Sequence, residues 1–170
     1  AGKFNDEIVP VEVVNRIVGK DNKIVEQKRM FEMDEGVRPG TTVEVLGKLR
    51  PAFNVKGSVT AGNSSQMSDG AASVLLMDRE KAVAEGLTPL LKFRSYAVAG
   101  VEPEVMGIGP VPAIKKLLAR TALTLADIDR FEINEAFAAQ AVAVQQVLGI
   151  ESKKLNVNGG AIALGHPVGA

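Results

Sequence analysis

The single histidine of this 170-residue chain, His166, lies in the closing stretch "NVNGGAIALGHPVGA" (156–170). An imidazole titrates near neutral pH, so a histidine held in a glycine-rich loop suits acid–base or oxyanion chemistry. The glycines let the backbone approach another group closely, and Pro167 suits the first turn of a following helix. The loop also has the spacing of a phosphate-binding loop, but His166 and Pro167 replace its lysine and its hydroxyl residue. A histidine with a purely structural role is the alternative.

Asn134 is the second candidate, because it lies between a predicted strand and a predicted helix. An asparagine there either caps the helix or points from the strand into the crevice where α/β proteins bind ligands. The third candidates are the hydroxyls of Ser64 and Ser65 in "TAGNSSQMSDG" (60–70). That stretch is either a turn-rich connector or a surface for a polar ligand. Position alone leaves these alternatives open.

Strands and short helices alternate along the chain, which predicts the α/β class. The strands are expected from β-branched and apolar runs at 7–18, 24–25, 71–77, 90–101, 130–133 and 155–158. The helices are expected from capping residues and helical spacing at 78–86, 110–123 and 134–149. The charged, irregular part over 27–53 is predicted to be a loop-rich excursion, with helical character only over 43–49.

The composition excludes several classes of function. The 20 basic and 20 acidic residues balance, so nucleic acid is not expected as a partner. No apolar run approaches the ~20 residues of a membrane span, so no membrane partner is expected. Without cysteine, and with one histidine, the chain has no disulfide, thiol nucleophile or multi-histidine metal site. Its start, "AGKFNDEIVPV", lacks an initiator methionine, and we expect a fragment of a longer protein.

Four ordered motifs resemble one family, the thiolases. They are spread over the chain as "GNSSQMSDGAASVLLM" (62–77), "AGVEPEVMGIGPVPAIKKLL" (99–118), "NEAFAAQ" (134–140) and "NGGAIALGHPVGA" (158–170). The resemblance covers essentially the whole chain, and the combination is more specific than any one glycine loop. The sequence of the first motif is closer to that of degradative 3-ketoacyl-CoA thiolases than to that of biosynthetic acetoacetyl-CoA thiolases.

The resemblance implies a thiolase fold, which is a five-layered αβαβα arrangement in the complete protein and is incomplete here. Residues 1–79 correspond to the last part of the N-terminal domain, including the remainder of its loop domain. Residues 80–170 correspond to the C-terminal domain, truncated at its C-terminal end. The implied reaction is thiolytic cleavage of a 3-ketoacyl-CoA to acetyl-CoA and a shortened acyl-CoA, or the reverse Claisen condensation. Fatty acid β-oxidation is the implied setting.

The resemblance also implies partners. Acyl-CoA and CoA are substrates, and no metal or other cofactor is needed. The full-length protein is expected to be a homodimer or homotetramer. Its expected location is cytoplasmic, or mitochondrial or peroxisomal in a eukaryote.

The resemblance implies roles for individual residues. His166 matches the histidine that activates the nucleophilic thiol and lines an oxyanion site, and Asn134 matches the asparagine that orients a water there. The implied contacts with CoA and substrate are Arg38, Phe53, Ala61, Ser64, Ser65, Ala136 and Phe137. Arg38 could equally be a solvated surface charge. Both catalytic cysteines of the family lie outside this chain, so the chain alone is expected to be inactive.

Other functions remain open from the sequence. One is a non-catalytic thiolase-like protein that binds acyl-CoA, and another is a biosynthetic thiolase specific for acetoacetyl-CoA. A third is a nucleotide-binding α/β module that uses the glycine loop. A decarboxylating ketoacyl synthase is disfavoured, because such enzymes typically use two histidines with their cysteine.

Overall fold

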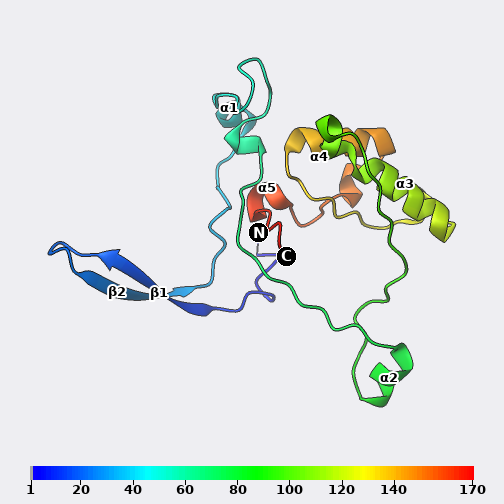
Figure 1. The fold of residues 1–170 in the computed structure, drawn as a ribbon, viewed down its shortest axis with the longest axis horizontal. Helices are drawn as coiled ribbons and strands as arrows, with labels where there is room; N and C mark the ends of the chain where they lie inside the picture. The colour runs from blue at the N-terminus through cyan, green and yellow to red at the C-terminus, as the bar shows by residue number, and fades with distance from the viewer. Residues whose placement is uncertain (1) are drawn as a thin grey trace. The chain divides into compact units, whose positions relative to one another are not determined.

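Residues 2–170 are described by the computed structural model, and they divide into two units, one up to Val37 and one from Arg38 to Ala170. The first unit is built on an antiparallel hairpin of β1 (Val11–Val18) and β2 (Ile24–Phe31) (Figure 1). Within residues 2–170 no helix is both long and apolar enough to cross a membrane.

The hairpin closes through a turn over residues 19–23. The Gly19 N–H donates to the carbonyl oxygen of Lys23 at 2.8 Å, and Asn22 adopts a left-handed backbone with φ of 58°. Asparagine tolerates that conformation better than most residues. Arg16 and Glu26 face each other across the register and form an ion pair at 3.1 Å. The first strand lies within the predicted range of 7–18 but begins four residues later, at Val11.

The predicted loop-rich excursion is wrong at its beginning, because residues 27–31 belong to β2. Each of these residues faces a partner on β1, as in the pair of Val11 and Phe31. Cross-strand pairing of this kind stabilises a strand whose own propensity is ordinary.

The second unit consists of short helices joined by extended segments (Figure 1). The α-helices are α1 (Val43–Leu46), α2 (Arg79–Ala84), α3 (Pro110–Thr121), α4 (Ala138–Leu148) and α5 (Ala161–Leu164). The 3₁₀ turns are η1 (Ala61–Asn63), η2 (Pro103–Ile108), η3 (Leu125–Asp127) and η4 (Ser152–Lys154). In η3 the Thr124 hydroxyl and N–H donate to Asp127, and these bonds lower the pKa of that carboxyl.

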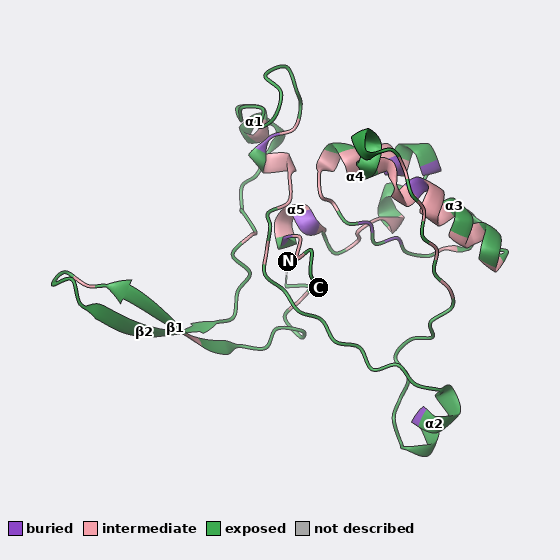
Figure 2. Cartoon of the chain, in the orientation of Figure 1, coloured by how far each residue is buried: buried purple, intermediate pink, exposed green. Residues whose placement is uncertain are grey.

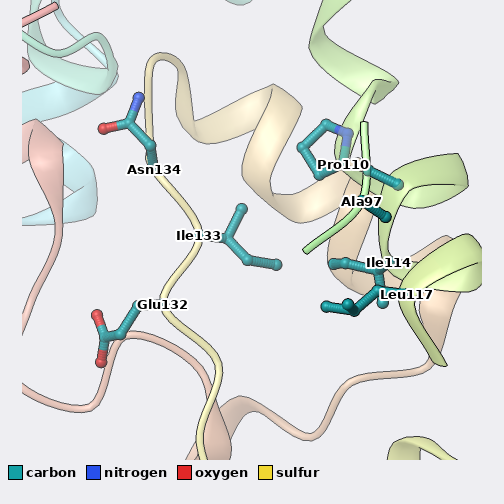
Figure 3. Close-up of a pocket in the computed structure, with 8 residues that line it drawn as sticks. Ala97, Pro110, Ile114, Leu117, Glu132, Ile133 and Asn134 are labelled. Atoms are coloured by element: carbon teal, nitrogen blue, oxygen red, sulfur yellow. The ribbon is translucent and has the colours of Figure 1, made fainter. Parts of the chain in front are cut away.

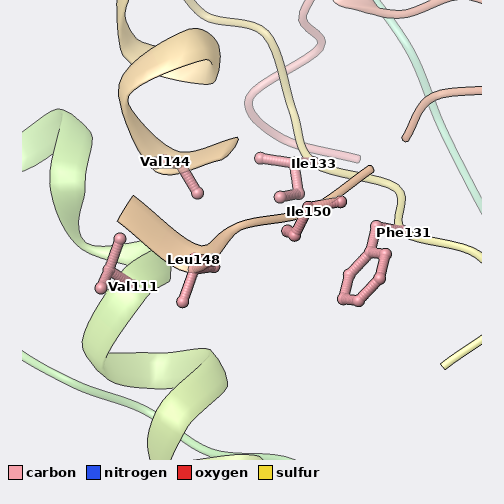
Figure 4. Close-up of a cluster of buried hydrophobic side chains, with 6 residues drawn as sticks. All are labelled: Val111, Phe131, Ile133, Val144, Leu148 and Ile150. Atoms are coloured by element: carbon pink, nitrogen blue, oxygen red, sulfur yellow. The ribbon is translucent and has the colours of Figure 1, made fainter. Parts of the chain in front are cut away.

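The hydrophobic core of the second unit lies where α3 and α4 pack together. Val144 of α4 is completely buried, and Figure 4 shows it with the other buried members of the cluster, Val111, Phe131, Ile133, Leu148 and Ile150. Burying a side chain of this size contributes about 1.5–3 kcal/mol relative to leaving it exposed. The core thereby fixes the segment around Ile133 against both helices, which matters for the site described below.

Two predicted strands, 71–77 and 90–101, are wrong in this structure. Both segments are extended but have no strand partner within residues 2–170, and Figure 2 shows them largely exposed. Leu91, for example, is 93% exposed. A strand needs a neighbouring strand to accept and donate its backbone hydrogen bonds, so propensity alone does not make one.

Side chains from α3 hold part of the second of these segments in place. Lys116 Nζ donates to the carbonyl oxygen of Val98 at 3.0 Å, and Arg120 Nη1 donates to that of Tyr96 at 2.7 Å. The predicted strands near 131 and 155 form a single parallel bridge between Phe131 and Leu155. The chain is therefore mixed α/β, with little regular sheet in its second unit.

Candidate functional site

Three segments of the second unit carry most of the predicted site residues. We call them the serine segment (60–68), the asparagine segment (131–137) and the histidine segment (155–166). Isolated bridges join each segment to both of the others: Ser64 with Phe137, Met67 with His166, and Phe131 with Leu155. Segments separated by up to about a hundred residues in the sequence are thus brought together.

The serine segment begins with a capping box at Thr60, which is only 8% exposed. The Thr60 N–H donates to Asn63 Oδ1 at 2.8 Å, and the Gly62 N–H donates to Thr60 Oγ1 at 3.2 Å. Ser64 Oγ then donates back to the carbonyl oxygen of Thr60 at 2.7 Å. Ala61 is the first residue of η1 and is exposed. These local hydrogen bonds fix the backbone just before Ser65, which contacts Ala136.

Ser65 joins the serine segment to the asparagine segment. Its backbone N–H and its Oγ both donate to the carbonyl oxygen of Ala136, at 3.0 and 3.1 Å. One residue further on, the ring of Phe137 meets that of Phe53 edge to face, with 6.0 Å between centroids. Such a contact adds roughly 0.5–1.5 kcal/mol beyond burial. The structure therefore brings together four predicted residues and places Ser64 beside them.

His166 is tied to the serine segment through its backbone. The His166 N–H donates to the carbonyl oxygen of Gln66 at 2.9 Å, next to the bridge with Met67. The preceding residue, Gly165, has φ of 98° and packs against Ser68, where a Cβ would lie 2.9 Å from the Ser68 Cβ. Glycine is required there by both the backbone conformation and the space.

The side chains of His166 and Asn134 are free. Neither donates or accepts a hydrogen bond with any residue from 2 to 170, whereas the neighbouring polar residues Ser64, Ser65 and Glu135 are all engaged. His166 is half-buried and Asn134 is exposed. An imidazole and an amide with unused donors and acceptors are available to a ligand or a water.

Asn134 does not cap α4, so the capping alternative is wrong. The helix begins at Ala138, four residues later than predicted, and Phe137 occupies the capping position without a side-chain bond. Residues 132–134 alternate instead as a strand does: Ile133 points into an apolar hollow of about 300 Å³ beside α3, while Glu132 and Asn134 point away (Figure 3). The core thus turns the Asn134 side chain outward.

His166 lies between helix α5 and a turn over residues 167–170, where the sequence predicted the first turn of a following helix. Helix α5 precedes it, and residues 167–170 form a turn in which the Ala170 N–H donates to the carbonyl oxygen of Pro167 at 3.1 Å. Gly165 ends α5 in a conformation that redirects the chain. His166 is therefore delivered by the C-terminal end of a short helix.

Arg38 is not joined to the other candidates. Its side chain is exposed, and its carbonyl oxygen accepts from Thr41 Oγ1 at 2.8 Å. No described residue contacts its guanidinium through a hydrogen bond or ion pair. Its two alternatives, a ligand contact and a solvated surface charge, stay open.

Sequence reasoning missed Glu135 and Asn156, which connect the asparagine and histidine segments. Asn156 Nδ2 donates to Glu135 Oε1 at 2.9 Å, and the Ile162 N–H donates to Glu135 Oε2 at 3.4 Å. Asn156 also has a left-handed backbone, with φ of 44°. An asparagine shortly before two glycines is a signal for such a turn, but it does not reveal the distant partner.

Comparison with known proteins gives a consistent result. The N-terminal domain of thiolase matches residues 1–80, and the C-terminal domain of thiolase matches residues 87–170. A 3-ketoacyl-CoA thiolase of Bacillus subtilis is 65% identical over 99% of this chain and 43% of its own length.

Two solved structures agree with this result. An acetyl-CoA acetyltransferase of Bacillus anthracis has a TM-score of 0.88 and 47% identity, over 99% of this chain and 40% of its own. The dimeric peroxisomal thiolase of Saccharomyces cerevisiae has a TM-score of 0.86 and 47% identity, with the same coverage of both chains. The chain thus spans about two fifths of the length of these proteins. Because both domain matches, the sequence identity and the fold agree, the chain belongs to the thiolase family.

Proposed function

We propose that this chain supplies the histidine, the asparagine and part of the CoA site of a longer acyltransferase that transfers acyl groups between 3-ketoacyl-CoA and CoA. The observation that carries the proposal is the pair of unengaged side chains, His166 and Asn134, on segments that are otherwise held by hydrogen bonds. A scaffold that satisfies its own polar groups and leaves two of them free is what a catalytic site requires.

The proposed chemistry needs a thiol that this chain does not contain. A thiol is mostly protonated at pH 7, and the imidazole of His166 takes its proton before the thiolate attacks. In thiolysis the thiolate adds to the 3-keto carbonyl, and the acetyl-CoA enolate leaves and is protonated; in the reverse condensation the thiolate attacks the thioester of an acyl-CoA. Attack and enolate formation both build negative charge on oxygen. The His166 imidazole, and a water held by Asn134, donate hydrogen bonds to that charge. In the complete protein we expect one cysteine before these residues and one after them.

The geometry around the serine segment supports the proposed CoA contacts. Ser65 Oγ donates to a backbone carbonyl, and its lone pairs remain available to a pantetheine amide N–H. The paired rings of Phe53 and Phe137 offer an apolar wall to the pantetheine and acyl groups. The other proposed contacts are Ala61, Ser64, Ala136 and, for the phosphates, Arg38. CoA serves as substrate, and no prosthetic group is part of the proposal.

The finer proposal is a degradative thiolase acting in fatty acid β-oxidation. The name of the Bacillus subtilis relative supports it, whereas the Bacillus anthracis structure is named an acetyl-CoA acetyltransferase. The proposed assembly is a homodimer or homotetramer, supported by the dimeric yeast structure. A cytoplasmic location, or a mitochondrial or peroxisomal one in a eukaryote, belongs to the same proposal. So does the domain boundary between residues 79 and 80.

The direct test compares the full-length protein with the 170-residue chain. The full-length protein should cleave acetoacetyl-CoA in the presence of free CoA, and the chain alone should not, because its residues include no thiol nucleophile. A spectrophotometric assay of 3-ketoacyl-CoA consumption measures both. Activity of the pure chain would contradict the proposed division of roles. Binding of CoA by a full-length protein that lacks turnover would favour the non-catalytic acyl-CoA-binding alternative.

CoA affinity should depend on the buried capping box. Thr60→Ala in the full-length protein removes the hydroxyl that caps η1, which typically costs about 1 kcal/mol, and loosens the backbone around Ser64. We expect the KM for CoA to rise several-fold with a smaller change in kcat. Thr124→Ala is the matched control, because Thr124 makes the same kind of capping box at the exposed η3. Equal effects of the two substitutions on KM would contradict the assigned role of the serine segment.

A further inference from the structure

We propose that Glu135 and Asn156 form a brace that positions His166. The inference rests on the proposed function, because it gives the two residues a role in presenting the histidine of that site. Neither residue was among the predicted site residues, and neither has a free side chain. Their contacts connect the asparagine segment to the helix that delivers His166.

The side-chain amide of Asn156 pairs with both backbone groups of Ile133, as the backbone of a neighbouring strand would. Its Oδ1 accepts from the Ile133 N–H at 2.9 Å, and its Nδ2 donates to the Ile133 carbonyl oxygen at 2.9 Å. The same Nδ2 donates to Glu135 Oε1 at 2.9 Å. The side chain thereby fixes the backbone on one side of Asn134 and the carboxylate on the other. Its backbone φ of 44° shows that the chain bends sharply at this point.

Glu135 carries the connection from Asn156 to α5. Its Oε2 accepts from the Ile162 N–H in the first turn of that helix at 3.4 Å. Its carboxylate also packs directly on Gly160, where a Cβ would overlap it. Gly160 therefore gives the carboxylate access to the start of α5. A half-buried carboxylate that uses both oxygens in this way is held in one position.

Because α5 is short, fixing its first turn also restricts the position of His166, which follows the helix. Helix α5 has four residues, and the Gly165 N–H donates to the carbonyl oxygen of Ala161 at 2.8 Å. His166 follows immediately and is held from the other side by the carbonyl oxygen of Gln66. The brace fixes the beginning of α5, and Gln66 fixes His166, two residues after its end.

Positioning, and not proton transfer, is the role that fits Glu135. Both of its oxygens already accept hydrogen bonds from Asn156 and Ile162, and it does not contact the His166 side chain through a hydrogen bond. A displacement of about 1 Å in a catalytic group can lower a rate about 10²-fold. Loss of the brace should therefore reduce kcat and leave the CoA contacts of the serine segment intact.

The first test is Glu135→Gln in the full-length protein. Two donors, the Asn156 amide and the Ile162 N–H, face this side chain, so an amide must turn its own NH₂ against one of them. We expect kcat for thiolysis of acetoacetyl-CoA to fall about 10- to 100-fold, with the KM for CoA nearly unchanged. Glu132→Gln is the matched control, because Glu132 is exposed and unbonded three residues earlier, and its kcat should stay at the wild-type value.

The second test is a rescue that a merely structural role would not produce. Asn156→Asp alone places two carboxylates face to face and should lower kcat. In the double variant with Glu135→Gln, the amide NH₂ at position 135 can donate to the carboxylate at position 156. The amide oxygen at position 135 can still accept from the Ile162 N–H. The double variant should then exceed both single variants in kcat, although the Ile133 carbonyl still loses a donor. If Glu135→Gln does not fold, Glu135→Asp keeps both acceptors with a shorter reach and should lose kcat in the same direction.

Failure of the brace is distinguishable from failure of the proposed function. Unchanged kcat in the folded Glu135 variants, or strictly additive effects in the double variant, would overturn the brace. Those results leave the role of His166 standing if His166→Ala still abolishes turnover. Near-normal turnover of His166→Ala would instead overturn the proposed function itself.

Discussion

Replacing His166 by alanine in the full-length protein should lower kcat for acetoacetyl-CoA thiolysis by about 10³-fold or more. Two contributions are lost together: the base that deprotonates the thiol and a donor to the developing oxyanion. The affinity for CoA should stay near its original value, because His166 is not among the proposed CoA contacts. Steady-state kinetics and a calorimetric titration with CoA measure the two quantities.

The control for this prediction comes from the same loop. Asn158 is exposed, and no hydrogen bond of its side chain occurs within residues 2–170. Asn158→Ala should therefore leave kcat within about a factor of two, as is usual for surface substitutions away from special features. A His166→Ala enzyme with near-normal turnover would show that the imidazole is not part of the reaction. Loss of CoA binding in parallel with turnover would assign His166 to the ligand site instead.

Local signals predicted the parts of the fold that depend on local interactions. The helix expected over 78–86 is α2, with Asp78 Oδ1 accepting from the Glu80 N–H at 2.8 Å and Gly86 left-handed at its end. The helix expected over 110–123 is α3, which starts at a proline as predicted. A cap or a proline acts within one turn, so its effect can be inferred without knowing the rest of the fold.

Features that depend on distant partners were not predictable in the same way. The run at 71–77 has the composition of a strand, but the residues described here give it no neighbour. Asn134 has the character of a helix cap, yet Ile133 packs against the core and the helix begins only at Ala138. In both places tertiary contacts, and not propensity, decide the conformation.

The candidate site was predictable as a set of residues but not as an assembly. The motifs pointed to Ser65, Ala136 and Phe137 separately, and the structure joins them through hydrogen bonds and a bridge. Glu135 and Asn156 were missed because their function lies in a contact 21 residues apart in the sequence. The sequence places Glu135 next to Asn134 but does not show that both of its carboxylate oxygens accept hydrogen bonds.

The glycines of the histidine segment provide the second large expected effect. Gly165→Ala combines a left-handed backbone, φ of 98°, with a Cβ that overlaps Ser68. The conformational cost is about 1–2 kcal/mol and the overlap adds about 1–3 kcal/mol. We expect a clear drop in the free energy of unfolding of the full-length protein, together with a loss of kcat, because this residue directly precedes His166.

Three further substitutions separate the two causes. Gly159→Ala meets no atom within 4 Å but has φ of 104°, so it carries only the conformational cost. Gly160→Ala has an ordinary backbone but overlaps Glu135, so it carries only the steric cost and disturbs the brace. Gly169→Ala carries neither cost within residues 2–170.

Denaturant unfolding and steady-state kinetics on all four variants give the required ranking. Gly165→Ala should be the least stable, and Gly169→Ala should match the wild type. Gly160→Ala should lose more kcat per unit of lost stability than Gly159→Ala, because only the former displaces the Glu135 carboxylate from the start of α5. Equal stability of the Gly165 and Gly169 variants would mean that the loop relaxes freely around His166. Such a loop could not hold an imidazole in place for proton transfer, and the geometric basis of the proposed site would be lost.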